Sequence, residues 1–199
     1  MTGLRDRKKQ QTRDALVAAA LRLVDERGLE RVTVEEISEA ADVSPRTFFN
    51  YFATKDDALI GDPIVDALEM RDRLSLVPAD VPIIDALLLA LAPAVAAIQA
   101  QRALWLVRMR VIDNNPGVLP ALMARGMVAE REFIAALAER TGSTPSDALP
   151  QIVAAASGAA FRIAMMRWAL DGDRDFSHFV NEAFAVLAGM ATTPTDEEA

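Results

Sequence analysis

Residues 33 to 52, TVEEISEAADVSPRTFFNYF, constrain the fold more than any other stretch of the chain. Thr33 and Glu36 have the T-x-x-E spacing of a capping box, which predicts the start of a helix of about two turns. Ser44 followed by Pro45 predicts a second helix start, because serine is a good N-cap and proline fits the first helical position. The few residues between these segments leave room only for a tight turn. We therefore expect two short helices joined by that turn.

A longer helix is predicted to precede this pair, from about Lys8 to Arg27. Leu16, Ala20 and Leu23 recur at helical spacing along one stripe of it. Gly28 lies where a C-terminal cap belongs. A long helix that braces two short ones is the outline of a helix-turn-helix, and the rest of the chain is also helical in pattern.

The second short helix separates its side chains by face. At 100° per residue, one side is apolar and consists of Pro45, Phe48, Phe49 and Phe52. The opposite side is polar and consists of Arg46, Thr47, Asn50 and Tyr51. We expect the apolar side to pack on the first two helices, while the polar side has the hydrogen-bonding groups that address base edges and phosphates. An ordinary amphipathic surface helix has the same pattern and is the alternative interpretation.

Lys55 is a further candidate phosphate contact. Thr54 is predicted to be the N-cap of the next helix with Asp57 at its third position, which places Lys55 in the first turn. The helix dipole disfavours a cation there, whereas a bound phosphate would favour one. A solvated lysine balanced by Asp56 and Asp57 is the alternative.

The charge distribution suits one DNA-binding segment in an acidic chain. The net charge is -8, yet residues 1–60 hold 10 Lys and Arg against 11 Asp and Glu. Five of those basic residues form a short arm within residues 1–13.

With no cysteine and His178 as the one histidine, we expect no catalytic site, no metal site and no cofactor. An all-helical enzyme is a remote alternative.

The segment TVEEISEAADVSPRTFFNYFATKDDAL, residues 33–59, closely resembles the DNA-binding segment of the TetR family of bacterial transcriptional regulators. With the preceding helix, the resemblance covers about residues 8–60. It implies an all-α fold of about nine helices, in which a three-helix helix-turn-helix DNA-binding domain precedes a helical ligand-binding and dimerisation domain. We expect these domains to span residues 1–53 and 54–191, followed by a disordered tail, 192–199.

The resemblance implies DNA contacts at Thr33, Ser44, Arg46, Thr47, Asn50, Tyr51 and Lys55. Thr47 and Asn50 would meet the groove, and Tyr51 and Lys55 would hold phosphates. Arg46 stands at a variable position of the family and is expected to contact bases specifically. Phe49 departs from the family, which commonly has a tyrosine there, and Asp42 replaces the usual turn glycine.

The second part of the chain is predicted to begin with a helix from about Thr54 past Arg71. Pro82 is expected to start the next helix, which Pro93 interrupts or kinks. Later helices are expected over about residues 119–140, 145–170 and 176–190. The stretch RALWLVRMRVIDNNPGVLPALMARG, residues 102–126, is similar to the regulatory domain of the mycofactocin-type branch of the family.

Methionine and aromatic residues of this second part are candidates for an effector site. We expect the site to be lined by Trp105, Arg108, Met109, Met127, Phe161, Met165 and Trp168. Deformable methionine surface beside arginine favours a mainly apolar effector, with a carboxylate or an acyl chain as one option. A simple hydrophobic core accounts for the same residues and is the alternative.

The last two helices contain IVAAASGAAFRIA and FVNEAFAVLAGMA, whose small residues permit close helix approach. A symmetric partner that offers the same pair would complete a four-helix bundle, and internal core is the alternative. We therefore expect a homodimer that binds a palindromic double-stranded DNA operator as a ligand-released repressor. The alternative is a regulator without a small-molecule effector.

The basic N-terminal segment lacks the apolar stretch of a signal peptide, so we expect a cytoplasmic protein without membrane contact.

Overall fold

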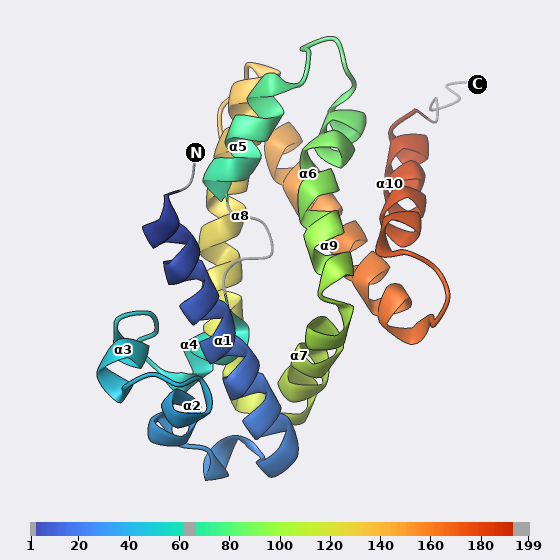
Figure 1. The fold of residues 1–199 in the computed structure, drawn as a ribbon. Helices are drawn as coiled ribbons and strands as arrows, with labels where there is room; N and C mark the ends of the chain where they lie inside the picture. The colour runs from blue at the N-terminus through green and yellow to red at the C-terminus, as the bar shows by residue number, and fades with distance from the viewer. Residues whose placement is uncertain (1–2, 62–66, 193–199) are drawn as a thin grey trace, which may run out of the picture. The chain divides into compact units, whose positions relative to one another are not determined.

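The computed structural model describes residues 3–61 and 67–192. Within these residues the chain forms ten α-helices and two short 3₁₀ helices, and no strand (Figure 1). The all-α fold class predicted from the sequence is confirmed.

The contacts divide the chain into two compact units. The first comprises residues 1–62 and 101–125, and the second residues 63–100 and 126–199. The first unit contains α1 (Leu4–Arg27), η1 (Leu29–Arg31), α2 (Val34–Ala40), α3 (Pro45–Phe49), α4 (Lys55–Ile60), α7 (Arg102–Asn114), η2 (Pro116–Val118) and the start of α8 (Leu119–Thr141). The second contains α5 (Ala67–Leu76), α6 (Ile83–Ala100), the rest of α8, α9 (Ala148–Leu170) and α10 (Phe176–Thr192).

The core of the first unit is built around α1, which packs on α2, α4 and α7. Leu16 and Leu21 of α1 are fully buried, as are Ile37 of α2 and Phe48 of α3. The predicted apolar stripe of the first helix is therefore its buried face. Because α3 has only five residues, it depends on this packing for its stability.

The predicted fourth helix through Arg71 is wrong, because α4 ends at Ile60 and Gly61 has a φ of 71°. A left-handed backbone cannot continue a helix and suits glycine. The Arg108 guanidinium also lies close to Gly61, so that a Cβ at residue 61 would lie 2.8 Å from it and the arginine would have to shift. The next helix begins at Ala67.

The core of the second unit contains an aromatic cluster between α9 and α10. Trp168 lies against Phe176 with their ring centroids 4.9 Å apart, and Phe161 meets Phe176 edge to face. Gln99 of α6 accepts a hydrogen bond of 2.7 Å from the Phe176 backbone N–H. Helix α6 is thereby joined to the start of α10. The end of α10 is Thr192, and the remainder of the predicted tail lies outside the described residues.

Arg140 of α8 closes the end of α5. Its guanidinium donates to the backbone carbonyls of Leu74, Val77, Pro78 and Val81 at 2.8 to 3.1 Å. The last carbonyls of a helix have no partner within it, so a cation there satisfies them and offsets the helix dipole.

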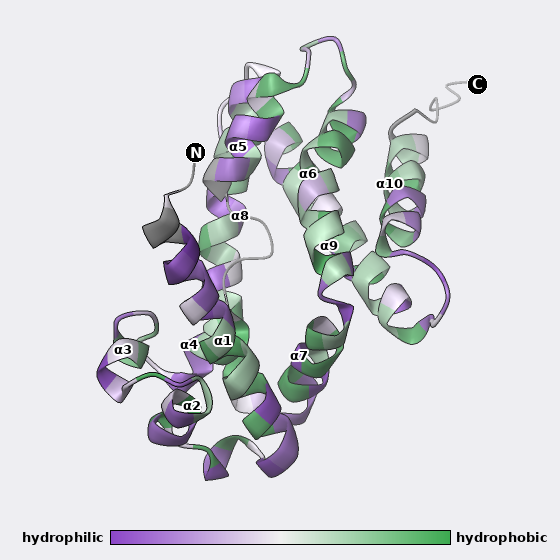
Figure 2. Ribbon diagram, in the orientation of Figure 1, coloured by the Kyte–Doolittle hydropathy of each residue, from purple (hydrophilic) through white to green (hydrophobic). Residues whose placement is uncertain are grey.

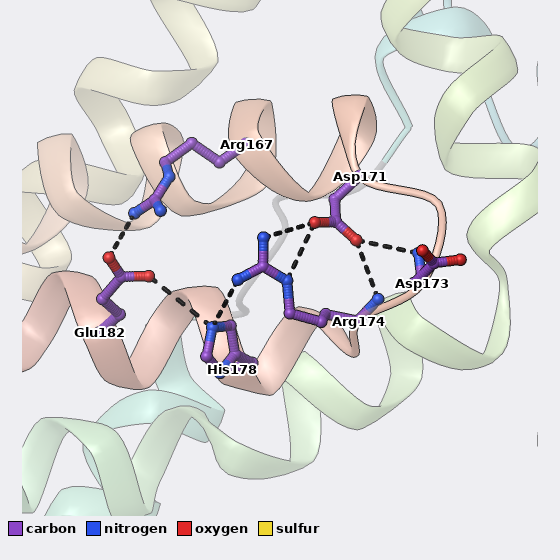
Figure 3. A network of polar contacts seen from close by, with 6 residues as sticks. All are labelled: Arg167, Asp171, Asp173, Arg174, His178 and Glu182. Carbon is purple, nitrogen blue, oxygen red and sulfur yellow. Dashed lines mark hydrogen bonds and ion pairs between the residues drawn. The ribbon is translucent and has the colours of Figure 1, made fainter.

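A chain of charged side chains connects the end of α9 to the start of α10 (Figure 3). Asp171 accepts bonds from Arg174 and from the backbone N–H groups of Asp173 and Arg174. These donors, the Arg174 backbone first, hold the pKa of Asp171 far below its usual value. Arg174 also contacts His178, and Arg167 pairs with Glu182 at 3.0 Å. His178 is thus part of this polar surface network.

Two helices of the second unit are apolar along most of their length. Figure 2 shows α6 and α9 largely in the hydrophobic colours, in contrast to the hydrophilic N-terminal half of α1. Both have the length and composition that a membrane span requires, although the core helices of a soluble protein meet the same criterion. Their packing within a helical unit favours the second interpretation.

Candidate nucleic-acid interface

Local capping positions the two short helices α2 and α3. The Thr33 hydroxyl accepts the backbone N–H of Glu36, and the Glu36 carboxylate accepts the backbone N–H of Thr33. Arg27 at the end of α1 pairs with Glu36 at 2.9 Å. The Thr33 backbone N–H, aided by Arg27, holds the pKa of Glu36 below its usual range. The predicted capping box is present and is also joined to α1.

The turn between α2 and α3 depends on Asp42, which has a φ of 55°. Aspartate tolerates this left-handed conformation better than most residues, so it can replace the expected glycine. The Ser44 hydroxyl then accepts the backbone N–H of Thr47 at 3.1 Å, and Pro45 opens the helix. The predicted start of α3 is therefore confirmed.

The exposed face of α3 differs from the predicted one. Phe48 and Phe52 are buried as expected, but Phe49 is 57% exposed. Tyr51 is half-buried and packs against the core of the first unit. The prediction that Phe49 packs inward was wrong: on the helix it lies about 100° from the buried Phe48, at the edge of the apolar side, and it remains exposed. The prediction that Tyr51 points away was also wrong, because α3 ends at Phe49 and Tyr51 no longer follows the ideal helical wheel.

The fully exposed residues of α3 and its C-cap are Pro45, Arg46, Phe49 and Asn50. Thr47 lies at the edge of this face, where its hydroxyl is 2.9 Å from the Ser44 hydroxyl. The residues between Asp42 and Lys55 include one charged side chain, that of Arg46. This face is therefore cationic, polar and free of carboxylates, a composition that DNA contacts require.

Lys55 has a structural partner that the sequence did not predict. Its ammonium group donates to the carbonyls of Leu29 at 2.8 Å and Val32 at 3.3 Å. The predicted cap of α4 is also present, since Thr54 and Asp57 exchange backbone-to-side-chain hydrogen bonds. Lys55 therefore joins the first turn of α4 to the segment that leads into α2.

Arg13 of α1 has a role that the sequence did not predict. Helix α1 begins at Leu4, so most of the predicted basic arm is helical. The Arg13 guanidinium donates to the Tyr51 carbonyl at 3.3 Å and lies 4.4 Å from the centre of the Phe52 ring. Arg13 thus holds the end of α3 on α1. The signal available in the sequence was an arginine one helical turn before the apolar stripe.

Two further arginines join helices of the first unit. Arg110 of α7 makes a two-point ion pair with Asp25 of α1 at 2.7 and 2.8 Å, and its hydrogen bonds hold the pKa of Asp25 below its usual value. Arg125 of α8 pairs with Asp57 of α4 at 2.7 Å and also donates to the Gly61 carbonyl. Helices α1 and α4 are thereby connected to α7 and α8.

The predicted effector residues are distributed over both units. Trp105, Arg108 and Met109 lie on α7 in the first unit, where the Arg108 guanidinium is 4.6 Å from the Trp105 ring centre. The others lie in the second unit: Met127, Phe161, Met165 and Trp168. Trp168 and Met165 are buried there, Phe161 packs on Phe176, and Met127 is 55% exposed. Their joint role in one site stays a prediction.

No group of three or more potential metal ligands occurs among the residues that the structure describes. His178, the histidine of the chain, has Arg174 and Glu182 as neighbours.

Together, a capped two-helix motif braced by α1 and an exposed cationic face on α3 define a helix-turn-helix DNA-binding protein. The family profile described as bacterial regulatory proteins, tetR family, matches residues 16–60, and the profile of the MftR C-terminal domain matches residues 81–192. The chain belongs to the TetR family of transcriptional regulators. Both resemblances noted in the sequence are therefore confirmed.

Similar proteins support the same assignment over most of the chain. The HTH-type transcriptional regulator TcmR of Streptomyces glaucescens is 32% identical over 186 residues, covering 87% of this chain and 80% of TcmR. A Mycobacterium tuberculosis regulator named MftR for mycofactocin biosynthesis is 28% identical, covering 92% of this chain and 93% of MftR. The fold is similar to that of the Thermus thermophilus repressor FadR, with a TM-score of 0.57, 20% identity, and coverage of 94% and 99%.

Proposed function

We propose that this TetR-family regulator is a repressor that binds a palindromic operator as a homodimer and leaves it when a mainly apolar effector binds. The exposed face of α3, with Arg46 and Asn50 and without carboxylates, carries the proposal. DNA contacts would come from residues 1–53, and effector binding and dimerisation from residues 54–191. A protein with this role acts where the chromosome is, in the bacterial cytoplasm.

Base contacts are assigned to the exposed side chains of α3. The Arg46 guanidinium suits a guanine edge and the Asn50 amide suits an adenine edge. Thr47 lies at the border of this face and contributes a methyl group and a hydroxyl group to the groove. Because Arg46 is exposed and has no carboxylate in its own segment, it is the first candidate for sequence discrimination.

Phosphate contacts are assigned to residues around α3: Thr33, Ser44, Tyr51 and Lys55. An ammonium group has three N–H donors, and the two carbonyls that Lys55 contacts leave one of them for a phosphate oxygen. The Tyr51 hydroxyl lies at the end of a half-buried side chain, which would direct it from the core toward the DNA backbone. These contacts position the protein without distinguishing sequences.

The outer face of α9 supports dimerisation. Apolar residues recur along it at alternating steps of three and four: Leu149, Ile152, Ala156, Ala159, Ile163, Met166 and Leu170. The large ones are exposed in the single chain. Because α9 also has a buried face toward α10, it is apolar on two sides, and such a helix needs cover on both. A second copy of α9 and α10 would supply it as a four-helix bundle.

Two glycines strengthen the dimer proposal. Gly158 of α9 and Gly189 of α10 are exposed, and a Cβ at either position would meet nothing within 4 Å. Glycine inside a helix costs about 1 kcal/mol relative to alanine, so its presence at two exposed helical positions favours a role in close helix packing. Close approach of a partner helix would give these glycines a role.

The effector proposal depends on the apolar character of the predicted site. FadR of Thermus thermophilus was solved in complex with lauroyl-CoA, which has a long acyl chain. In this chain, the predicted effector residues Trp105, Phe161 and Met165 are all apolar. Arg110 is paired with Asp25 and is therefore already neutralised within the chain. We therefore expect a ligand dominated by apolar atoms.

Binding of the purified protein to fragments of its source genome tests the central claim. We expect enrichment of a palindromic sequence whose half-sites are about 34 Å apart, or a small multiple of that distance. Arg46→Ala should relax the preferred sequence, whereas Tyr51→Phe should weaken binding to all sequences and reduce the salt dependence. Failure to enrich any sequence would overturn the proposed function.

A ligand panel tests the effector claim separately. Fatty acids, acyl-CoA esters and hydrophobic drugs are screened for a rise in melting temperature and for release of the enriched DNA. Each tenfold loss of operator affinity requires about 1.4 kcal/mol of coupling, and DNA must weaken effector binding by the same factor. A panel with no active compound, tested on protein that binds its operator, would contradict an apolar effector.

A further inference from the structure

Phe49 is the aromatic side chain of α3 that the core does not use. It is 57% exposed, whereas Phe48 and Phe52 are 0% and 3% exposed. An isolated exposed aromatic ring is unremarkable in most places, because much of any protein surface is apolar. On the exposed face of a helix that carries the DNA contacts, the same ring is placed where it meets the DNA.

The neighbours of Phe49 place it at the centre of that face. Pro45 lies one turn earlier at i−4 and Arg46 at i−3, so both are adjacent to Phe49 on the helix surface. Asn50 follows it at the C-cap, and all of these residues are exposed. Any duplex approached by Arg46 and Asn50 is therefore also approached by the Phe49 ring.

The Phe49 ring rests against one buried ring, that of Phe48. It meets the Phe48 ring edge to face, at 5.5 Å between centroids and an interplanar angle of 85°. Phe48 in turn packs on Phe52 at 5.6 Å. A ring oriented in advance loses little conformational entropy when it binds, which favours a specific contact.

The chemistry of the ring selects its partner on DNA. Phenylalanine has no hydroxyl group, so it cannot hydrogen-bond a phosphate oxygen or a polar base edge. Among the groups that mark a base pair in the major groove, the apolar one is the C5-methyl group of thymine. A tyrosine, which the family commonly has at this position, could make either a hydrogen bond or an apolar contact with the methyl group. Phe49 can make only the apolar contact.

We propose that Phe49 determines specificity by packing its ring on the C5-methyl group of a thymine in each operator half-site. This inference rests on the proposed operator binding. One helical turn rises about 5.4 Å and one base pair about 3.4 Å, so this thymine lies within about two base pairs of the base that Arg46 contacts.

Operator duplexes with single thymine-to-deoxyuridine replacements test the proposal, because they remove the methyl group and leave the base-pairing unchanged. The full-length protein is titrated against each duplex by fluorescence anisotropy. We expect one symmetric pair of positions at which replacement weakens binding by about fourfold per methyl group, the amount expected for one buried methyl. Replacement in both half-sites should weaken binding by about 15-fold, since the two contacts are independent.

Phe49→Ala should bind the thymine and deoxyuridine duplexes equally, because the ring that senses the methyl group is gone. Phe49→Leu, which retains an apolar side chain, should recover part of the discrimination. Tyr51→Phe, which alters a proposed phosphate contact just after α3, is the control: it should weaken binding to both duplexes equally and keep the full discrimination. Unchanged circular dichroism and melting temperature would establish that Phe49→Ala folds, as expected for an exposed position.

Two results would overturn the inference while leaving operator binding intact. One is equal affinity of the unaltered protein for every deoxyuridine duplex. The other is a methyl effect that persists in Phe49→Ala, which would assign methyl sensing to another side chain. Absence of any enriched operator would instead overturn the proposed function, and this inference with it.

Discussion

The two-helix motif α2–α3 and the helix pair α9–α10 are stabilised in opposite ways. Helices α2 and α3 have seven and five residues, and each begins at a residue whose side chain caps it, Thr33 and Ser44. Helix α9 has 23 residues, and its N-cap residue, Asp147, makes no capping bond to it. Short helices are marginal alone and need caps and anchors, whereas a long helix gains its stability by packing.

The outer faces of these two regions differ as much as their ends do. The outer face of α3 is polar and cationic around the single ring of Phe49, and that of α9 is apolar over almost its whole length. A polar face is stable in water and can exchange solvent for DNA. An apolar face of that length is a poor surface for a protein in water. We therefore expect the proposed DNA contact of α3 to be reversible and the proposed dimer contact of α9 to be permanent.

The largest effect is expected from Phe48→Ala, because Phe48 is fully buried where α3 meets the core of the first unit. Loss of the ring should lower the free energy of unfolding by about 3 to 5 kcal/mol and abolish DNA binding. The units contain one tryptophan each, Trp105 in the first and Trp168 in the second. Urea unfolding followed by Trp168 fluorescence in a Trp105→Phe background, with and without Phe48→Ala, reports on the second unit alone. An equal shift of that transition would show that the two regions unfold as one.

The next largest effect is expected from Ile163→Glu on the outer face of α9. A carboxylate buried between two apolar helices costs about 3 kcal/mol, which corresponds to a dimer dissociation constant more than a hundredfold higher. Sedimentation velocity at several protein concentrations measures it. Leu76→Glu, at an exposed leucine of α5, is the control and should leave the dimer intact. An unchanged dimer in Ile163→Glu would place the interface elsewhere.

A capping side chain should contribute more to the free energy of unfolding in the short helices α2 and α3 than in the long helix α9. Thr33→Ala and Ser44→Ala should each lower the free energy of unfolding by about 1 kcal/mol, since each removes a side-chain acceptor from an N-terminal N–H group. Asp147→Ala at the start of α9 should cost less, because Asp147 bonds the preceding Thr144 backbone and not the helix. Chemical denaturation of the three variants tests this order. A larger effect for Asp147→Ala would contradict the contrast between the two regions.

The smallest effect is expected from acid, through the Asp171 network between α9 and α10 (Figure 3). Because folding lowers the pKa of Asp171, the resulting stability is present above the unfolded-state pKa of about 3.9 and is lost as pH falls through the lower folded-state pKa. Asp171→Asn should therefore be less stable than the unaltered protein at pH 7, and the two should converge in strong acid. Thermal unfolding as a function of pH measures the difference. A difference that grew on acidification would have the wrong sign.

Particular residues show how far the sequence could predict the candidate site. The caps at Thr33, Ser44 and Thr54 were predictable because a cap depends on residues three positions apart. The exposure of Phe49 was not, since an ideal helical wheel places Phe49 at the edge of the apolar side and does not show how much of that side the other helices cover. The end of α4 at Gly61 was also missed, because a glycine after an apolar helical stretch is compatible with the helix continuing as well as with its end.

The long-range arginine contacts were beyond the sequence altogether. Arg13, Arg110 and Arg125 each reach a partner more than thirty residues away, at Tyr51, Asp25 and Asp57. The sequence shows that an arginine has a positive charge and a long side chain, but many carboxylates and carbonyls of the chain could accept its hydrogen bonds equally well. Which one it meets is decided when the helices pack.

By itself, the sequence determined the all-helical class, the start of each short helix and the family, because these depend on spacings of a few residues and on a local motif. Tertiary structure decided which aromatic ring of α3 faces solvent, where α4 ends and which carbonyls Lys55 holds. Those outcomes depend on contacts between segments far apart in the chain. The exposed ring of Phe49, the basis for the proposed thymine contact, is one of them.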